Sequence, residues 1–420
     1  MSEESQAPEV VGRPASLSRS VRTLAAIWLA WAILIIGFQS LVQHRFQPQF
    51  PDQALEWTSV YTPVSGHRPY LFDPFMNSQV EWDSEYYLSI SIAGYDDPDV
   101  PMSDTADGPV SMNYAFFPLY PLVMRVVSWP LKLLDLTPIA TATLAGVLVS
   151  VVSTLGAMLA LYALAVDQLG ERGAVRAAFY LLIFPTGFFL AQVYTEGLFL
   201  ALAFGVMALV RRHRWVWAVI LALLAPWCRA VGVILVVPLA VAWLLQTDWR
   251  QLTWRPFPWK LVGRGVGVLL PLVSFLVWKT SILGTSQALV ADASLGRGLF
   301  LFAVSFRRWW AAWMSIGGDN PATSAYYLIE FGCVVVALVA CLFTLRRYPG
   351  PALFGLLALI VSWSSGEPQS LNRYVLVVPS LYLFLSHLGR SEVFDRAWTL
   401  VSVLLMGLLV TLFTFGMWVG

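Results

Sequence analysis

The residues best suited to chemistry in this sequence lie in one short run, EWDSEYYL over 81–88. We expect a helix here with Asp83 in its first turn, where the helix dipole favours the ionised carboxylate. Seated at the membrane surface by aromatic rings, this carboxylate could take a proton from a sugar hydroxyl. The structural alternative is that Asp83 only caps the helix. The residues that recur at helical spacing are Trp82, Tyr86, Ile90 and Ala93, with Gly94 placed to end the helix.

A few isolated charges lie at turns between apolar stretches that carry almost no other charge. Glu196 and Arg229 each stand at such a turn, and Arg373 shares the turn 364–374 with Glu367. Arginine binds phosphate through parallel hydrogen bonds, so Arg229 and Arg373 suit a phosphate or pyrophosphate ligand. Snorkelling side chains and isolated capping ion pairs are the alternatives.

Two further ionisable residues, Lys279 and Glu330, fall closer to the predicted membrane interior. An ionisable group is costly there, which suggests a role in function. A salt bridge between the two residues, or a lysine that reaches back to the interface, would account for them equally well.

Membrane helices must position these residues. Of the 420 residues, 58% are hydrophobic and 12% are charged, whereas a soluble domain is about 25% charged. An apolar stretch over 23–42 and ten later windows without charge predict an all-α polytopic membrane protein of about eleven transmembrane helices. The later windows are 136–166, 177–195, 197–210, 215–228, 230–247, 265–278, 331–345, 348–366, 374–389 and 397–420.

Basic residues at alternate junctions orient the predicted helices. Sixteen of the 26 lysines and arginines fall in six clusters that the positive-inside rule assigns to the cytoplasm. The N-terminus is then cytoplasmic, the C-terminus lies outside, and 23–42 is an uncleaved first helix because no small-residue cleavage site follows it. The excess of arginine over lysine hints at a GC-rich bacterial source and hence at a plasma membrane. The clusters are Arg13, Arg19 and Arg22; Arg172 and Arg176; Arg211, Arg212 and Arg214; Arg250, Arg255, Lys260 and Arg264; Arg346 and Arg347; Arg390 and Arg396.

The segment 43–137 becomes a single extracytoplasmic loop in this topology. It holds twelve acidic and four basic residues, and a loop of this length is usually functional. Its part 116–134 is apolar but carries two basic residues and three prolines, so we expect an amphipathic helix on the outer surface. Residues 1–20 are polar and predicted to form a disordered cytoplasmic tail, which leaves 21–420 as one integral membrane domain.

Charge and cysteine content argue against other kinds of site. The formal net charge of +1 provides no basic surface for nucleic acid. Cys228, Cys333 and Cys341 lack metal-ligand spacing and are interpreted as small core residues. The sequence has no P-loop and no glycine-rich strand-to-helix fingerprint, so it does not indicate a nucleotide site.

Several segments taken together resemble one known family. They are EWDSEYYLSI over 81–90, AGY over 93–95, YAFFPLYP over 114–121, FPTGFF over 184–189, YTE over 194–196, RAVG over 229–232 and SLNRY over 370–374. In this order they resemble the PIG-V-like mannosyltransferases, whose relatives in the GT-C superfamily use lipid-phosphate sugars. The predicted loop 284–321 does not follow the family pattern, which leaves the acceptor open.

The resemblance implies an inverting transfer of a hexose, above all mannose, from a polyprenyl-phosphate donor to a glycan or glycolipid acceptor on the extracytoplasmic face. The family's catalytic acid falls on Asp83, and Glu196 matches the acid of its second outer loop, so both are expected to be catalytic residues. Arg373 matches the arginine near the donor phosphate. Some superfamily members use a divalent cation, for which Glu81, Asp83 and Glu196 are the candidate ligands here. The expected substrate-binding residues are Glu81, Trp82, Tyr87, Tyr120, Tyr194, Arg229 and Arg373.

Two other functions agree with the same number of spans. A transporter or lipid flippase would bind its substrate near the middle of the membrane, between inverted repeats. The sequence shows no such repeat, and its acids concentrate in one outer loop. A non-catalytic membrane subunit could use that loop to bind a partner, an alternative that turnover of a lipid-phosphate sugar by this chain alone would exclude.

Overall fold

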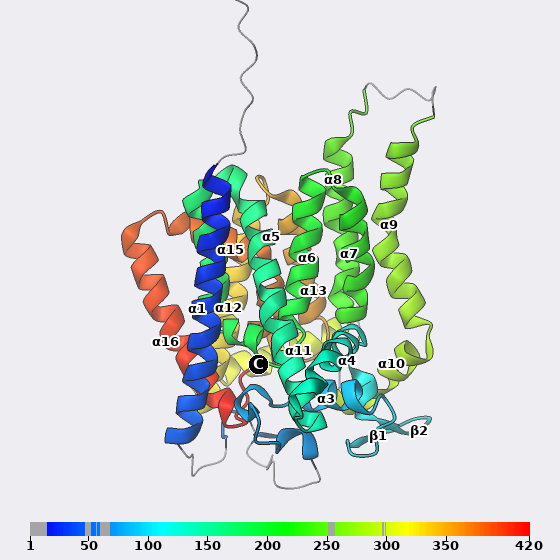
Figure 1. Ribbon diagram of the computed structural model, residues 1–420, viewed down its shortest axis with the longest axis vertical. Helices are drawn as coiled ribbons and strands as arrows, with labels where there is room; N and C mark the ends of the chain where they lie inside the picture. The colour runs from blue at the N-terminus through cyan, green and yellow to red at the C-terminus, as the bar shows by residue number, and fades with distance from the viewer. Residues whose placement is uncertain are drawn as a thin grey trace, which may run out of the picture.

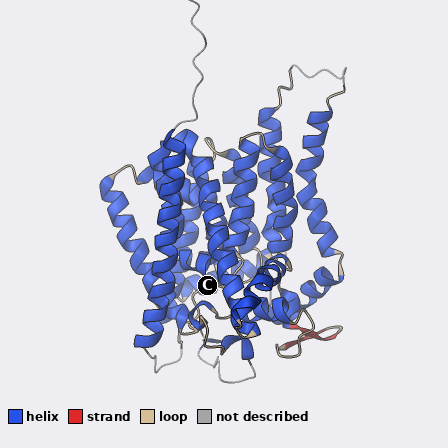
Figure 2. Ribbon diagram, viewed as in Figure 1, coloured by secondary structure: helices blue, strands red, loops and turns tan. Residues whose placement is uncertain are grey.

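The computed structural model describes residues 15–46, 52–55, 57–58, 68–250, 257–295, 298 and 300–420. Helices dominate this part of the chain, and the long ones run roughly side by side (Figures 1 and 2). Strand β1 (Met102–Thr105) pairs antiparallel with β2 (Gly108–Ser111), and Met102 lies opposite Ser111. The predicted all-α class is confirmed, and this small hairpin inside the long loop is an addition to it.

Five helices in the described residues are long and apolar enough to cross a membrane, as judged by length and composition. A polytopic membrane protein is therefore confirmed, but the predicted count of eleven spans is not. The five are α1 (Ala15–Arg45), α5 (Pro138–Ile183), α9 (Trp259–Lys279), α12 (Pro321–Thr344) and α16 (Glu392–Thr414). Shorter helices of the bundle are α6 (Glu196–Arg211), α7 (Trp215–Cys228), α8 (Val236–Gln246), α13 (Pro349–Trp363) and α15 (Pro379–Leu388).

Helix α5 contains two of the predicted spans. Its backbone is helical except at Gly170, whose φ of 67° and ψ of 175° break the helix between the windows 136–166 and 177–195. The helix ends at Ile183 because Phe184 precedes a proline, which disfavours the helical conformation. The window 177–195 is therefore α-helical only in its first half, and a 3-10 turn, η5 (Gly187–Ala191), follows.

Two later windows also contain shorter α-helices than predicted. In 374–389, Pro379 begins α15 and disfavours the helical conformation at the residue before it, so this window opens with the 3-10 turn η7 (Val375–Val377). In 397–420, α16 stops before Gly416, whose φ of 68° starts a turn. Residues 417–420 consequently form an irregular tail instead of the end of a span.

The predicted loop 284–321 is mostly helical. It contains α10 (Ile282–Leu295) and α11 (Phe302–Met314), and α12 then begins ten residues before the predicted window 331–345. The early start follows from Asn320, whose side chain accepts hydrogen bonds from the next helix turn while proline occupies the first helical position.

The bundle has two different ends. Helix α6 begins at Glu196 and ends at Arg211, so we call these the Glu196 end and the arginine-rich end. Helices α3 (Ser84–Ile92), α4 (Leu119–Leu131) and α10 gather with the hairpin at the Glu196 end (Figure 1). Helix α4 buries Tyr120 and Met124 and exposes Val126 and Trp129, which confirms the amphipathic helix predicted within 116–134.

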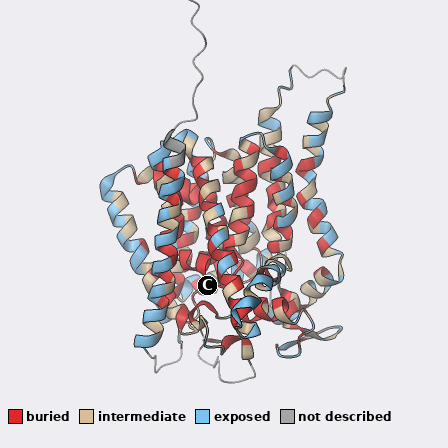
Figure 3. Cartoon of the chain, in the orientation of Figure 1, coloured by how far each residue is buried: buried red, intermediate tan, exposed pale blue. Residues whose placement is uncertain are grey.

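Helix α5 occupies the centre of the bundle. In its most apolar window 61% of the residues are buried, against 22% for α1 and 33% for α16 at the periphery (Figure 3). Small residues allow close contact between the central helices: a Cβ atom on Gly197 of α6 would lie 2.5 Å from the Ser150 carbonyl oxygen of α5. This contact fixes the start of α6, and with it Glu196, against α5.

Candidate active site

Asp83 lies at the start of α3, and the predicted helix around it is confirmed. Trp82, which was expected to belong to the helix, instead has a φ of 53°, a left-handed conformation that few residues other than glycine adopt. At the other end, Gly94 has a φ of 106°, and Arg125 donates hydrogen bonds to carbonyls of the last turn. Asp83 occupies the N-cap position, yet its side chain makes no capping hydrogen bond. Its carboxylate is therefore available for another role.

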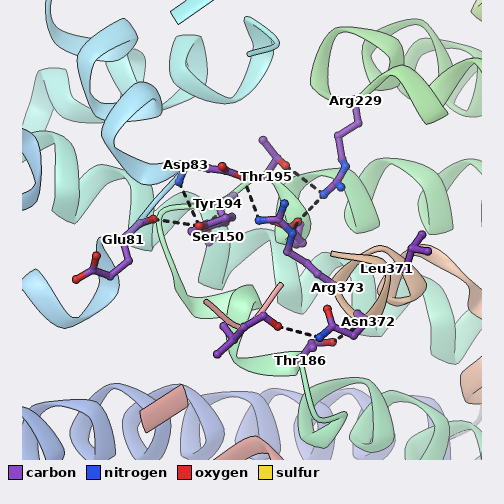
Figure 4. A network of polar contacts seen from close by, with 12 residues as sticks. Glu81, Asp83, Ser150, Thr186, Tyr194, Thr195, Arg229, Leu371, Asn372 and Arg373 are labelled. Carbon is purple, nitrogen blue, oxygen red and sulfur yellow. Dashed lines mark hydrogen bonds and ion pairs between the residues drawn. The ribbon is translucent and has the colours of Figure 1, made fainter. Parts of the chain in front are cut away.

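This carboxylate is the first of four charged side chains, from separate segments, that are linked one to the next by ion pairs; Asp83, Arg373 and Arg229 are labelled in Figure 4. Arg373, in the one-turn helix α14 (Leu371–Tyr374), donates from Nη1 to Asp83 Oδ2 at 3.0 Å. Its Nε atom lies 3.5 Å from Oε1 of Glu196, the first residue of α6. Arg229, which follows α7, donates from Nη1 to the same Glu196 oxygen at 2.6 Å. Two acids and two arginines thus alternate, and their formal charges cancel.

Aromatic rings hold the Arg373 guanidinium between its two acids. Its central carbon lies 5.2 Å from the ring centroid of Tyr194 and 5.3 Å from the rings of Phe189 and Tyr374, within cation–π range. The side chain is only 6% exposed. Because a buried charge without a partner is strongly destabilising, the ion pairs to Asp83 and Glu196 are required to keep Arg373 in this position.

The segment that carries Arg373 is strained and anchored. Ser370, directly before α14, is fully buried with a φ of 73°. Thr186 donates from Oγ1 to the Asn372 carbonyl at 2.9 Å, and Asn372 donates from Nδ2 to the Val419 carbonyl at 2.8 Å (Figure 4). Backbone strain of this kind persists only where the surroundings impose it and is concentrated at functional sites.

The four charged side chains line one cavity of about 820 Å³ at the Glu196 end. Four tryptophans of the described residues line the cavity. Three of them contact one another edge to face, with ring centroids 5.1 to 5.8 Å apart, and form the tryptophan wall. They are Trp57, Trp82 and Trp418. Other lining residues include Arg68, Tyr87, Lys279, Asp292 and Glu367.

Three residues predicted to bind substrate are absent from the described lining of the cavity. Tyr194 lies behind Asp83: its hydroxyl donates to the Glu81 carbonyl at 3.0 Å and accepts from the Asp83 amide at 3.3 Å. Tyr120 is fully buried, and its hydroxyl donates to the Gly146 carbonyl at 3.0 Å. The Glu81 side chain points away from Asp83 (Figure 4). The remaining predicted residues do line the cavity: Trp82, Asp83, Tyr87, Glu196, Arg229 and Arg373.

Comparison with known families decides where the chain belongs. A family profile described as mannosyltransferase (PIG-V) matches residues 29–262, more than half of the 420 residues. The chain belongs to this family. The matched segment includes Asp83, Glu196 and Arg229, whereas Arg373 lies beyond it and joins them through the fold. A search of curated proteins returns no match.

Some solved structures resemble this PIG-V family member remotely. An oligosaccharyltransferase of Archaeoglobus fulgidus with a tethered acceptor peptide has 13% identity and a TM-score of 0.41, over 92% of this chain and 55% of its own. ArnT from Cupriavidus metallidurans bound to undecaprenyl phosphate has 14% identity and a TM-score of 0.44, over 92% of this chain and 76% of its own. The chain spans about half the length of the archaeal enzyme, and similarity this remote bears on no particular residue.

A divalent cation does not fit the three acids considered for it in this mannosyltransferase-family chain. Burial raises the pKa of the Glu81 carboxyl well above its usual range, although the charge of Arg68 opposes this, and its side chain points away from Asp83 (Figure 4). The space between Asp83 and Glu196 is taken by the Arg373 guanidinium. Across the described residues, no group of three or more His, Cys, Asp or Glu side chains converges on a common point.

Trp57 and Trp418 are among the lining residues that sequence reasoning missed. Trp418 is in the tail after α16; its indole nitrogen donates to the Tyr326 hydroxyl at 3.1 Å, and its backbone amide donates to Asp52 at 3.1 Å. A single tryptophan in an apolar stretch carries no signal of such a contact in a chain with 19 tryptophans.

A buried glutamine cluster behind the site was also missed. Gln192 donates to the Gln39 side-chain oxygen at 2.9 Å, and Gln79 donates to the same oxygen at 3.3 Å. Gln39 in turn donates to the Ser78 carbonyl at 2.6 Å. Gln39 is a lone amide side chain within the first apolar stretch, and its position there was the sequence signal that could have indicated a buried polar contact. The cluster ties α1 to the segment that leads into Asp83.

Lys279 and Glu330 do not form the salt bridge considered from sequence. Glu330 is fully buried in α12 and accepts a hydrogen bond from the Leu371 amide at the start of α14. Lys279 ends α9 and lines the cavity instead. Glu330 therefore supports the segment of Arg373, while Lys279 belongs to the site itself.

Proposed function

We propose that this chain is a GT-C-type mannosyltransferase that moves mannose from a polyprenyl-phosphate donor to a hydroxyl of a glycan or glycolipid acceptor. The observation that carries the proposal is the carboxylate of Asp83, which lies in a cavity at the Glu196 end of a PIG-V family member and is oriented by Arg373. The arginine-rich end would face the cytoplasm by the positive-inside rule, so the reaction would occur on the extracytoplasmic side of a plasma membrane.

Asp83 is suited to act as the general base. One carboxylate oxygen, Oδ2, is held by Arg373, and the side chain remains 27% exposed to the cavity. The other oxygen can accept the proton of an acceptor hydroxyl. The hydroxyl oxygen then bonds to the anomeric carbon from the face opposite the phosphate. The bond between that carbon and the phosphate oxygen breaks, polyprenyl phosphate leaves with the electron pair, and the anomeric configuration inverts.

Glu196 and Arg373 act as positioning residues in this proposal. Glu196 is 1% exposed and pairs with Arg373 and Arg229 through one oxygen, Oε1. Arg373 reaches both acids, so its geometry fixes the direction of the Asp83 carboxylate. Sequence reasoning assigned Arg373 and Arg229 to the donor phosphate, but two acids already balance their charges.

The tryptophan wall supports a sugar ligand over a purely polar one. Trp82 directly precedes Asp83 and contacts Trp418 with ring centroids 5.1 Å apart. Aromatic rings offer apolar faces with a polar edge, and a hexose presents C–H groups on its ring faces. A mannose seated against this wall would lie beside the proposed base.

The position of the cavity favours transfer over transport. Its lining includes Lys279, the last residue of α9, which is long enough to cross a membrane, so the cavity lies at one end of a candidate span. A transporter is expected to bind its substrate near the middle of the membrane instead.

Purified protein supplied with labelled polyprenyl-phosphate mannose and a lipid or glycan acceptor provides the test. We expect wild-type protein to release polyprenyl phosphate and Asp83→Asn to lose at least about 100-fold in rate, because the base is removed. Asp104→Asn, an exposed acid in the hairpin of the same loop, is the matched control and should keep its activity. Transfer by Asp83→Asn at the wild-type rate would contradict the assignment of the base.

A further inference from the structure

Four basic side chains line the cavity in the described residues, and three of them have an acidic partner. Arg68 pairs with Glu85 at 3.3 Å, and the remaining two arginines form the pairs with Asp83 and Glu196 already given. Lys279 has no ion pair within the described part of the chain. Among the four basic side chains of the cavity, Lys279 is therefore the one that contacts no acid in the described residues.

Lys279 lies where a lipid-facing helix reaches the site. It is the last residue of α9, and only 28% of the most apolar window of that helix is buried. Trp278 beside it is 2% exposed and stacks on Phe117 of the cavity wall, with centroids 4.5 Å apart. The exposed apolar residues along the last two turns are Leu272, Val273, Leu276 and Val277. A lipid tail along α9 would bring its headgroup to Lys279.

The turn after α9 holds this lysine in a defined place. Gly284 of α10 packs against the backbone of Trp278 and Lys279: a Cβ on Gly284 would lie 2.7 Å from the Lys279 Cα and even closer to the Trp278 carbonyl. Glycine is the one residue that allows this approach. Helix α10, which contributes Gln287 and Asp292 to the lining, is therefore fixed relative to Lys279.

We propose that Lys279 binds the phosphate of the lipid-linked substrate. The proposal rests on the proposed function. The charges of Asp83, Glu196, Arg229 and Arg373 sum to zero. The phosphodiester of the donor therefore requires a further positive charge, and the phosphate monoester that leaves requires it even more. An ammonium group is a compact point charge suited to this purpose, and it would stabilise the charge that develops on the leaving oxygen. The lysine thus takes the role that sequence reasoning gave to Arg373.

A purely structural role for Lys279 makes different predictions. A lysine at a helix C-terminus can simply stabilise the helix dipole. Alternatively, Asp292, which is exposed and lines the same cavity, could be its partner in solution, although no ion pair joins them in the described structure. In either case, loss of the lysine would change stability without changing phosphate binding.

The composition of the chain allows a direct footprint on wild-type protein. It has three lysines, Lys132, Lys260 and Lys279. We expect polyprenyl phosphate to slow the acylation of Lys279 by an amine-reactive reagent at least about fivefold, because the bound phosphate keeps the ammonium form. Lys132 lies exposed at the same end and Lys260 exposed near the start of α9, so both should react unchanged. Equal reactivity of Lys279 with and without the lipid would overturn the proposal.

Binding measurements on variants separate the remaining cases. We expect Lys279→Gln to weaken polyprenyl phosphate binding about tenfold, the size of one charge-assisted contact, to raise the donor KM more than it lowers kcat, and to be rescued by Lys279→Arg. Lys132→Gln is the matched control. Unchanged affinity with a lower melting temperature would favour the dipole role and overturn the proposal, while the mannosyl transfer assay of Asp83→Asn would still stand. Failure of wild-type protein to bind polyprenyl phosphate would contradict both the role of Lys279 and the proposed function. Equal protection of Lys279 by inorganic phosphate would overturn the assignment of a lipid-linked phosphate.

Discussion

Arg373 and Asp83 are 290 positions apart in the chain, yet the guanidinium of one donates to the carboxylate of the other at 3.0 Å. The arginine is almost completely buried, whereas the acid is partly open to the cavity. In this ion pair, Arg373 is held by the surrounding protein, whereas Asp83 remains accessible from the cavity. Such an arrangement orients the acid, and it makes the site depend on a residue outside the segment matched by the family profile.

Replacing Arg373 should harm both folding and activity. Arg373→Met leaves the buried Glu196 and the nearby Asp83 short of a partner, which costs about 3–5 kcal/mol for a buried pair. Arg373→Lys keeps the charge but cannot reach both acids in a planar fork, so the fold should survive while kcat falls at least about tenfold. Thermal unfolding of purified protein and the transfer assay measure the two effects. Arg396→Met serves as the control, because its ion pair with Glu392 is fully exposed on α16 and should matter little. Full activity of Arg373→Lys would contradict a positioning role.

Glu196 and Arg229 should show energetic coupling. Each single change, Glu196→Gln or Arg229→Gln, leaves a buried charge without its partner at 2.6 Å. The double variant removes both charges. Its loss in the free energy of unfolding should therefore be smaller than the sum of the losses in the two single variants, by at least about 1 kcal/mol. Chemical denaturation of the four proteins completes the cycle. Strict additivity would mean that the ion pair contributes nothing.

Trp418 should influence sugar binding from the tail after α16. Trp418→Ala removes one side of the tryptophan wall and the hydrogen bond to Tyr326. We expect the donor KM to rise roughly five- to tenfold, the value of one aromatic contact, with a smaller change in kcat. Trp129→Ala is the matched control, since that ring is 78% exposed on α4. Equal effects of the two substitutions would argue against a sugar-binding wall.

Two carboxyls of the long loop should give opposite dependences of stability on pH. Burial alone would raise the pKa of Asp97, but hydrogen bonds from Ser89, Tyr70 and the Asp99 amide lower it below its usual value. A lowered folded-state pKa stabilises the protein above the unfolded value of about 3.9, and this stabilisation is lost as pH falls through the folded value. The stability lost in Asp97→Asn should therefore be largest near neutral pH and shrink in acid.

Glu81 provides the reverse case. Burial raises its pKa, so its contribution is most favourable below the unfolded value of about 4.3 and is lost as pH rises through the folded value. Glu81→Gln should consequently gain stability relative to wild type as pH increases from about 4 to about 8. Melting temperatures of wild type and Glu81→Gln across this range, and of wild type and Asp97→Asn from about pH 6 down to about pH 2, test both signs. A difference that stays constant with pH for either variant would contradict its assigned shift.

Much of the site could be identified from sequence because isolated charges stand out in apolar surroundings. Glu196, Arg229 and Arg373 were singled out as charges at turns between apolar stretches, and Asp83 by the helical spacing of the run 81–88; all four line one cavity. The expected helix after Asp83 also formed, since its spacing and Gly94 are local signals. The effect of proline was not anticipated. Prolines interrupt the windows 177–195 and 374–389, so the α-helices in both are shorter than the uncharged windows predicted.

Pairing between distant residues was not predictable from the sequence. Tyr120 and Tyr194 share the family motifs with Asp83, yet neither lines the described cavity: Tyr194 supports the backbone at Asp83, and Tyr120 bonds to Gly146, because only packing decides which face of a segment meets a cavity. Trp418 reaches the site because Gly416 turns the tail inward. A sequence shows which residues are costly to bury, but it does not show which partner offsets that cost.

For this protein, the sequence by itself determined the helical membrane class, the end of the bundle where charges collect and the acids and arginines available there. Those properties follow from local composition and periodicity. Only the tertiary structure decided that Arg373 is committed to Asp83 and Glu196, that Glu81 turns away, and that Lys279 keeps a charge without a described partner. These outcomes depend on distances between segments hundreds of residues apart, and the packing of α5, α6 and α14 sets those distances.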